Sequence, residues 1–314
     1  MTNYLARRVG SLVFVLLGVT TLTFALGRLA PGDPAELVLE RALGRPPTDA
    51  QIDRMRERMG LDRPVAVQYV SWLNDAAHGE LGRSWGSGDE VHSLLAEALP
   101  RTILLAVTAL AIAVGVAVPL GTLAAARPGA WPDHLSRAAA VCGTSMPAFF
   151  IGYVLMFVFG VRLHALPIFG YGTARHLVLP SITLALGAAG ALTRITRASV
   201  ADVLAEPFMQ AAIARGVPRR RAVWRHALPV ALLPIVTVVA LAAGHLIGGA
   251  MIVEWMFSWP GIGKLGLDAI YNRDYPLIQG VVLLSAVVFT LLNFGADLAY
   301  LRIDPRVRLN ESDR

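Results

Sequence analysis

The chain has 314 residues, of which 55% are hydrophobic and 16% are charged, and its mean hydropathy is +0.56. This composition excludes an ordinary water-soluble fold and indicates a polytopic membrane protein. The net charge of +6 is carried almost entirely by arginines between apolar segments, which indicates orientation in a membrane and not binding of nucleic acid.

Residues 9–27 form the first apolar segment, which carries no charge and follows Arg7 and Arg8. At about 1.5 Å per residue it is long enough to cross roughly 30 Å of hydrocarbon, so we predict a first transmembrane helix within residues 1–28. A secretory signal peptide has a shorter apolar core of about 7 to 15 residues. We therefore expect this segment to be retained.

Residues 29–99 are the one sizeable polar region, and their mixed charges predict a small folded insert. Thr48 and Gln51 form a capping box that begins one helix, which Gly60 ends. Pro64 begins a second helix, which Gly79 closes. Each helix has an apolar face, and we expect these faces to pack on each other and on the membrane-embedded part. The faces consist of Ile52, Met55 and Met59 in the first helix and of Val67, Val70 and Ala77 in the second.

Five further apolar segments are predicted to span the membrane. They cover residues 103–126, 138–161, 177–193, 235–253 and 278–296. Pro119 and Pro147 lie inside two of them, where a proline predicts a kink. A polar stretch separates the last two segments, and its Trp255, Trp259 and Tyr271 are suited to a membrane interface.

A polar interruption at 207–229 separates the fourth and fifth of the six apolar segments, so it must lie outside the lipid. Good helix formers from 208 to 215 predict a short helix. Gly216 is suited to the left-handed conformation past its end, and Pro218 cannot continue it. A second short helix is expected to run toward Pro229.

This interruption resembles the EAA loop of ABC-importer permeases, in which Glu-Ala-Ala is followed after three residues by Gly and after nine more by Ile-x-Leu-Pro. The matching positions are Gln210, Ala211, Ala212, Gly216, His226, Leu228 and Pro229. Gln210 and His226 depart from the Glu and Ile of the family. In that family the loop forms the coupling helix that inserts into the ATPase subunit. The resemblance therefore implies a coupling site composed of Gln210, Ala211, Ala212, Arg215, Gly216, Leu228 and Pro229. The alternative is a basic cytoplasmic loop of no particular role.

Other stretches resemble the dipeptide, oligopeptide and nickel branch of the ABC permeases. The insert contains PGDP at 31–34, GLDRP at 60–64 and GELGRS at 79–84, and the third apolar segment contains Ser145-Met146-Pro147 followed by Phe149. The C-terminal third matches the same pattern at Glu254, Phe257, Pro260, Gly261, Gly263, Arg273, Asp274, Tyr275, Pro276, Gly280, Asn293, Asp297, Pro305 and Arg306. The resemblance thus extends over essentially the whole chain.

The resemblance implies an all-α protein of type I ABC-importer permease architecture, with six transmembrane helices and a mainly helical extracytoplasmic insert at 29–99. The permease core is expected at 100–303 and a cytoplasmic tail at 304–314. The implied partners are a second homologous permease subunit, two cytoplasmic ATP-binding subunits and an extracytoplasmic substrate-binding protein, in the cell membrane of a bacterium or archaeon. ATP and Mg²⁺ would bind to the ATPase subunits, so we expect no cofactor and no enzymatic activity in this chain.

Arginine and lysine residues predict the orientation independently. If the N-terminus is inside, fifteen of them lie on the cytoplasmic side. Only four, Arg162, Arg175, Lys264 and Arg273, lie in short outer loops. Long loops contribute little to this rule, so fifteen against four is the comparison that decides. The 207–229 loop is therefore predicted to be cytoplasmic, as are both termini.

Three other sequence patterns bear on dinucleotide binding, metal binding and proton transfer. GIGKLG at 261–266 matches G-x-G-x-x-G but follows Trp-Pro and not a β-strand, which argues against dinucleotide binding. The histidines lack the i, i+4 spacing of a helical metal site, and Cys142 has no partner thiol, so no metal site is expected. His245 and Asp297 could form a proton relay or contact substrate; a neutral histidine hydrogen-bonded between helices and an aspartate capping near the inner surface are the favoured interpretations.

Function has one favoured interpretation and several alternatives. We favour an importer permease for di- or oligopeptides that works by alternating access. Nickel chelates and glutathione stay open as substrates, because their importers share these motifs. A self-contained secondary transporter would require charged pairs deep in the spans and inverted repeats, and an intramembrane hydrolase would require a nucleophile near a base; the sequence displays neither convincingly.

Overall fold

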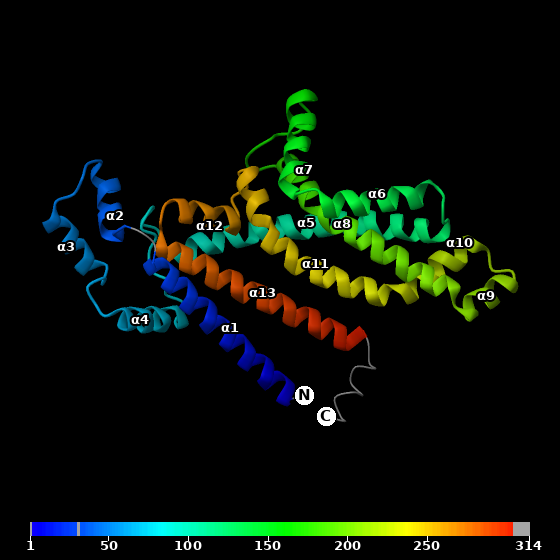
Figure 1. Cartoon of the computed structure of the whole chain (residues 1–314), viewed down its shortest axis with the longest axis horizontal. Coiled ribbons are helices and arrows are strands. Elements are labelled where there is room, and N and C mark those ends of the chain that lie inside the picture. Colours follow the sequence, from blue (N-terminus) through cyan, green and yellow to red (C-terminus); the bar gives the residue numbers. More distant parts are fainter. Residues whose placement is uncertain (1, 30–31, 304–314) are drawn as a thin grey trace. The chain divides into compact units, whose positions relative to one another are not determined.

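The computed structural model describes residues 2–29 and 32–303, and within these ranges the chain is mainly helical and contains no β-strand (Figure 1). The helices are α1 (Thr2–Leu29), α2 (Pro34–Leu43), α3 (Asp49–Arg58), α4 (Val65–Ala77), α5 (Val91–Ala126), α6 (Trp131–Ser145), α7 (Ala148–Leu155), α8 (Ala174–Ala205), α9 (Pro207–Ala214), α10 (Arg219–Arg221), α11 (Leu228–Met256), α12 (Ile262–Tyr271) and α13 (Tyr275–Ile303). Two π-helical segments join them, η1 (Met156–Arg162) and η2 (Ala222–Ala227). The predicted tail, with Pro305 and Arg306, lies outside the described residues, as does the side chain of Asp297.

Two compact units make up the chain. The first unit is Met1–Pro100 with Lys264–Thr290, and the second unit is Arg101–Gly263 with Leu291–Arg314. Each unit is described by itself below.

The described chain contains several helices of membrane-spanning length. Four are long and apolar enough to cross a membrane, namely Val91–Ala126, Ala174–Ala205, Arg219–Met256 and Tyr275–Gly295. A bent pair, Trp131–Gly143 with Ala148–Arg162, gives a fifth if it counts as one span, and α1 contributes the shorter apolar stretch Phe14–Gly27. The chain is therefore a multi-pass membrane protein. Helices α5, α8, α11 and α13 begin before the predicted spans, and α8, α11 and α13 also end after them.

Pro147 breaks the third predicted span instead of kinking it. The prediction of a single bent helix was wrong: α6 ends at Ser145, and the two halves of the pair meet at 109° (Figure 1). Met146 has extended backbone angles, φ −94° and ψ 128°, as expected for a residue forced out of the helical region by the proline that follows it. Pro119, in contrast, lies within the continuous helix α5.

The first insert helix was predicted correctly. The backbone N–H of Thr48 donates to Oε1 of Gln51 at 2.9 Å, which completes one half of the capping box, and Gly60 has φ +65° just after α3. Helix α2 was not predicted. Asp33 of the PGDP motif caps it by accepting from the N–H of Ala35 at 3.0 Å, and it also accepts from Nε of Arg56 at 2.7 Å. This hydrogen bond and the charge of Asp33 raise the pKa of Arg56 above its ordinary value.

The second insert helix buries a different face from the one predicted. Val67 and Val70 are 49% and 63% exposed, whereas Tyr69 and Trp72 are half-buried. The hydroxyl of Tyr69 lies 2.8 Å from Oγ1 of Thr21 on α1. An aromatic side chain buries more area than a valine and still has a polar atom that can meet a partner on α1, so the aromatic face packs inward.

A buried carboxylate organises one end of the second unit. Glu254 has no exposed surface; its Oε1 accepts from Oγ1 of Thr102 at 2.6 Å and its Oε2 from the N–H of Gly263 at 2.7 Å. It therefore caps the start of α12, where unpaired N–H groups favour negative charge. A Cβ at Gly261 or Gly263 would overlap the carboxyl group or Met251, so the glycines of the G-x-G-x-x-G stretch permit close approach to Glu254.

Trp259 was expected at the membrane interface, and this expectation was wrong. The side chain is 1% exposed, and its Nε1 donates to the carbonyl of Arg101 at 3.0 Å. The ring meets Tyr171 edge-on, with centroids 4.9 Å apart. Because the indole N–H finds an acceptor inside the unit, Trp259 can be buried completely. Trp255 and Tyr271 are exposed, at 45% and 73%.

Helices α6 and α8 approach each other closely at two glycines. A Cβ at Gly190 would lie 2.9 Å from the carbonyl oxygen of Ala139, and one at Gly143 would lie 2.8 Å from that of Leu186. Small residues allow such contact between membrane helices. A charged pair also joins the two helices. Asp133 in the first turn of α6 is fully buried, and its carboxylate accepts from Nε of Arg197 on α8 at 2.6 Å.

We predict that Gly190→Ala lowers the stability of the protein by about 1–3 kcal/mol, because the added methyl group would overlap α6. Gly187→Ala on the same helix is the control, since its Cβ would be 3.9 Å from the nearest atom. Thermal unfolding of the detergent-solubilised protein measures both. Equal unfolding temperatures for the two variants would contradict the close approach.

Candidate functional site

The 207–229 loop forms a short helix that begins and ends where the sequence predicts. Pro207 occupies the first turn of α9, where its missing N–H costs nothing, and Glu206 precedes it with extended angles. Gly216 has φ +90° and donates to the carbonyl of Ile213 at 2.9 Å. The chain thus leaves α9 through a left-handed residue.

The return from the loop contains a π-helical turn. Pro218 precedes α10, η2 follows, and the N–H of Leu228 bonds to the carbonyl of Val223, five residues back. Pro229 has no N–H, and in a regular α-helix its ring would clash with the carbonyl four residues earlier. The wider turn gives that ring room, so the Leu-Pro pair can begin α11 without a break.

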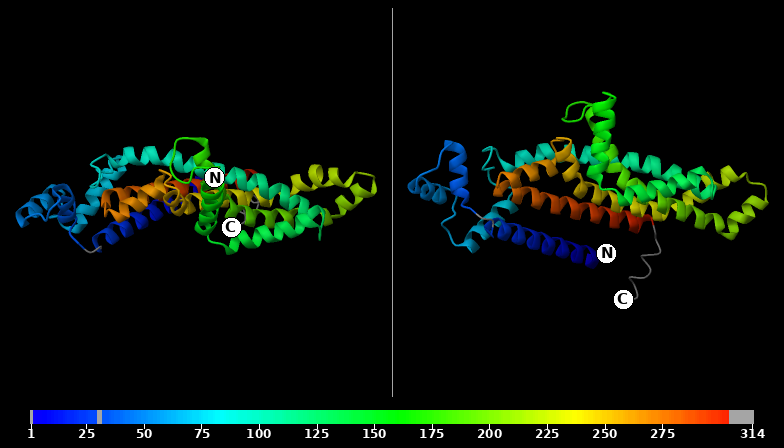
Figure 2. Two further views of the ribbon diagram at one scale, coloured as in Figure 1. Left: turned by 90° about the horizontal axis from the view of Figure 1, so that it is seen from above. Right: turned by 45° about the horizontal axis from the view of Figure 1, so that its top comes forward.

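The inner face of α9 is anchored within the second unit. Met209 is fully buried, and it packs in an apolar cluster with Val200 of α8 and Ala222 and Ala227 of η2. Ala212 is half-buried on the same side, three residues later. These contacts fix α9 against the end of α8, and Figures 1 and 2 show it where the chain turns from α8 back to α11.

Two large apolar side chains at the edges of the buried face of α9 are partly exposed, which is unexpected for a loop. Phe208 and Ile213 flank Met209 and are 49% and 43% exposed, and Ala211 is exposed on the outer side of the helix. Gln210 and Arg215 are also exposed. Their side chains bond to carbonyls of the chain itself: Nε2 of Gln210 to Ala205 at 3.2 Å and Nε of Arg215 to Ala211 at 3.2 Å.

The structure brings most of the predicted site residues together on α9 and distinguishes the two alanines. Ala211 faces outward and Ala212 packs toward its own unit, while Leu228 is half-buried and Pro229 exposed at the return. Phe208, Met209 and Ile213 were not predicted. Their signal was present, because large apolar side chains are unusual in a segment that lies outside lipid.

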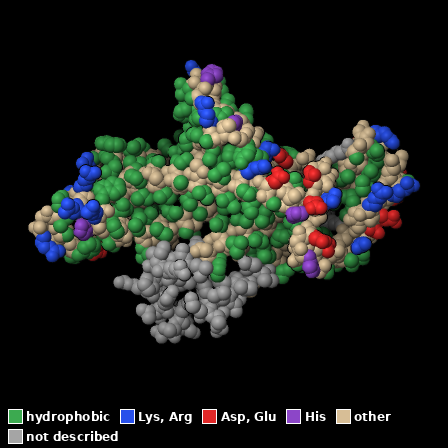
Figure 3. Space-filling view, turned by 180° about the vertical axis from the view of Figure 1, so that it is seen from behind, with side chains coloured by type: hydrophobic (Ala, Val, Ile, Leu, Met, Phe, Trp, Pro, Cys, Tyr) green, Lys and Arg blue, Asp and Glu red, His purple; other side chains and the backbone are tan. Residues whose placement is uncertain are grey.

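Basic side chains surround this helix. Arg219, Arg220, Arg221 and Arg225 are exposed, and Nη2 of Arg219 donates to the carbonyl of Ala126 at 3.1 Å. Figure 3 shows Lys and Arg gathered over this end, next to a largely hydrophobic surface. The site therefore combines an apolar helix face with a positive rim.

Other candidate residues do not form a site. Within the described residues no three His, Cys, Asp or Glu side chains are placed to hold a metal ion, and Cys142 is exposed on α6. His245 is exposed on α11 of the single chain, so its hydrogen bonding between helices stays a prediction. Its exposure follows from its register, because the neighbouring Gly244 and Leu246 occupy the buried positions.

We predict that Met209→Ala lowers the unfolding free energy by about 2–5 kcal/mol, because it leaves a cavity under α9. The neighbouring Phe208→Ala should change it by no more than about 0.5 kcal/mol, since that side chain is half exposed. Thermal unfolding of the purified protein tests the pair. A larger loss for Phe208→Ala would mean that α9 packs in the opposite sense.

Comparisons with known proteins now identify the family. Residues 117–309 match the binding-protein-dependent transport system inner membrane component, and residues 1–106 match the N-terminal part of such membrane components. A probable peptide ABC transporter permease protein, y4tP, of Sinorhizobium fredii is 39% identical over 316 residues, covering 98% of this chain and 100% of the relative. The glutathione transport system permease protein GsiC of Escherichia coli K12 is 39% identical over 309 residues, covering 98% and 99%.

A solved structure agrees at the level of the fold. The MetNI methionine ABC transporter in an inward-facing conformation matches with a TM-score of 0.57 at 18% identity, covering 67% of this chain and 96% of the matched chain. Family profiles over nearly the full length, relatives at 39% identity and this fold lead to one conclusion: the chain belongs to the binding-protein-dependent transport family and is a permease subunit of an ABC importer.

Proposed function

We propose that this subunit forms half of a peptide translocation pathway and receives energy from separate ATPase subunits through α9. The observation that carries the proposal is the partly exposed apolar surface of α9, where Phe208 and Ile213 flank the buried Met209 that anchors the helix. Exposed apolar side chains outside lipid mark a surface that a protein partner covers. Partner subunits of the importer class supply such a surface.

The proposed architecture is the six-helix, type I permease arrangement. Residues 1–28 contain the first span, residues 29–99 form an extracytoplasmic insert, residues 100–303 form the permease core, and residues 304–314 form a cytoplasmic tail. Both termini and the 207–229 loop face the cytoplasm. The bias of fifteen basic residues against four supports this orientation.

The proposed coupling surface uses Gln210, Ala211, Arg215 and Gly216 in distinct ways. Ala211 permits close approach of a partner because its side chain is a single methyl group, and Gln210 and Arg215 border it with polar groups. Gly216 sets the angle at which the chain leaves α9. Ala212 and Leu228 pack toward their own unit, and Pro229 lies in the first turn of α11. Movement of a partner would therefore be passed to α8 and α11, the helices joined by this loop.

Alternating access follows from this arrangement. ATP binding would draw two ATPase subunits together, and the two α9 helices seated on them would approach each other. The cavity between this subunit and a homologous permease would then open outward to an extracytoplasmic binding protein. ATP and Mg²⁺ belong to the ATPase subunits, and this chain performs no catalysis.

Peptides are the proposed substrate class, with glutathione and nickel chelates as alternatives. One relative carries a peptide name and another a glutathione name, and glutathione is itself a short peptide. A self-contained secondary transporter is the rival from a different class. It requires no partner on α9, so the coupling experiment below separates the two.

We predict that a cysteine at position 87 reacts with a membrane-impermeant thiol reagent in intact cells, whereas one at position 220 does not. Ser87 and Arg220 are both exposed in the structure, and Cys142 is first replaced by alanine because it is exposed as well. Permeabilised cells supply the control, since both cysteines should then react. Labelling at 220 and not at 87 in intact cells would reverse the orientation.

We predict that Ala211→Glu abolishes coupling in the assembled complex. The longer charged side chain would be buried against the ATPase subunit without a partner, which weakens docking by about tenfold or more. Substrate uptake and binding-protein-stimulated ATPase activity should fall together, while the amount of protein in the membrane stays normal, because Ala211 is exposed in the single chain.

Gln210→Glu is the matched control for this experiment. It introduces the same charge one position earlier, and it restores the residue common in the EAA loop, so coupling should persist. Wild-type uptake and ATPase activity in Ala211→Glu would refute α9 as the coupling helix. Uptake without any ATPase subunit would favour the secondary transporter.

A further inference from the structure

A cavity of about 510 Å³ lies within the first unit, remote in sequence from the coupling loop. Its wall is formed by α1, the turn between α3 and α4, α4 itself, the 80–85 loop and the start of α13. The volume is within the range of about 300–1,000 Å³ that is typical of small-molecule sites. No role described so far uses this cavity.

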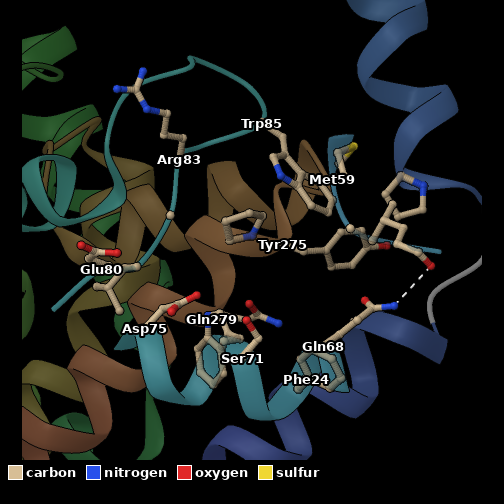
Figure 4. A pocket seen from close by; sticks show the side chains of 18 of the residues that line it. Phe24, Met59, Gln68, Ser71, Asp75, Glu80, Arg83, Trp85, Tyr275 and Gln279 are labelled. Carbon is tan, nitrogen blue, oxygen red and sulfur yellow. Dashed lines mark hydrogen bonds between the residues drawn. The ribbon is translucent and has the colours of Figure 1, made fainter. Parts of the chain in front are cut away.

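Aromatic side chains line the middle of the cavity. Trp85 and Tyr275 meet edge-on with ring centroids 5.5 Å apart, and Figure 4 shows both of them, with Phe24 below. Asp274 fixes this pair in place, because its buried carboxylate accepts from the N–H of Trp85 at 3.1 Å and caps the start of α13. This part of the cavity wall is therefore preorganised in the absence of a ligand.

One polar group in the wall lacks a partner. Nε1 of Trp72 is buried, and it has no hydrogen-bond acceptor within the described part of the chain. A buried indole N–H ordinarily finds an acceptor, and leaving it unpaired is unfavourable. Because this nitrogen has almost no accessible surface, it is not exposed to the cavity.

Charged side chains of both signs line the cavity. Figure 4 shows Asp75 and Glu80 near each other at one end and Met59 with Gln68 at the other. Arg58, directly before Met59 in the chain, and Arg63 also line the cavity.

The charged side chains of the cavity wall are not used up in ion pairs with each other. In the described ranges, no salt bridge involves Asp75, Glu80, Arg58 or Arg63. Arg83 differs, because its side chain points away from the two carboxylates in Figure 4 and pairs with Glu90 at 3.5 Å.

We propose that this cavity binds a short zwitterionic peptide, with the amino group at Asp75 and Glu80 and the carboxylate at Arg58 and Arg63. A simple organic cation would leave the arginines unmatched, and an anion would meet the two carboxylates. The inference rests on the proposed function for its placement outside the membrane and for the substrate class. It adds a peptide site on the insert itself.

Binding is tested on the assembled permease–ATPase complex in lipid nanodiscs without the binding protein. The probe is the dipeptide alanyl-alanine, compared with its N-acetylated form and its C-terminal amide. Calorimetry should detect saturable binding of the dipeptide, weakened about tenfold or more when either terminal charge is removed. Equal affinity for all three forms, or no saturable binding, would overturn the proposal.

Matched variants assign the binding to this cavity. The double substitution Asp75→Asn with Glu80→Gln should weaken dipeptide binding about tenfold or more, and Glu57→Gln, an exposed carboxylate on α3 outside the lining, should leave it unchanged. Unchanged affinity in the double variant would place the dipeptide elsewhere and refute the site.

Failure of this inference and failure of the proposed function have different signatures. Loss of dipeptide binding in the cavity variant would support the site. If Ala211→Glu left the ATPase activity of the same complex unchanged, the coupling through α9 would be refuted while the site would stand. Normal uptake in wild type with no dipeptide binding to the insert would refute the site alone.

Discussion

Buried carboxylates at helix starts are the constraint on which both units depend. In a chain that is mostly apolar, every bend away from a membrane helix exposes backbone N–H groups that lipid cannot satisfy. Glu254 supplies an acceptor where α12 begins, and Asp274 does so where α13 begins. Each carboxylate also reaches a distant segment, Thr102 in one unit and Ser84 in the other. Each of these two acidic residues therefore caps a helix and at the same time links that helix to a segment far away in the sequence.

A few local residues also determine the shape of the 207–229 loop. A proline begins α9, a glycine ends it, and a π-helical turn accommodates the proline that starts the next long helix. None of these devices needs a large core. The helix is held instead by the single deep side chain of Met209, which leaves its opposite face available to a partner. A short rigid lever joined to two membrane helices is suited to transmitting motion, because it has few internal degrees of freedom to absorb it.

The insert has more internal structure than a simple connection requires. Asp33 caps α2 and pairs with Arg56 of α3, Tyr69 joins α4 to α1, and Asp274 holds Trp85. These contacts preorganise a cavity lined by Asp75, Glu80, Arg58 and Arg63, none of which forms a salt bridge within the described part of the chain. A surface meant only to contact another protein would not need a wall built from five separate segments.

Sequence alone determined the class of the protein, the apolar segments, the family and the ends of α9, because hydropathy, proline and glycine act locally and their effects do not depend on distant residues. Tertiary structure decided what local patterns leave open. Val67 and Val70 had the right spacing for a buried face, yet α4 buries Tyr69, which has a hydroxyl partner on α1. Trp259 had the composition of an interface residue, but the carbonyl of Arg101 allowed its burial. Pro147 predicted a bend of unknown size, and only the tertiary structure gives its value of 109°. Which of Ala211 and Ala212 faces outward likewise depends on the packing of Met209. Its apolar neighbours belong to α8 and η2, so the sequence of α9 alone does not determine this orientation.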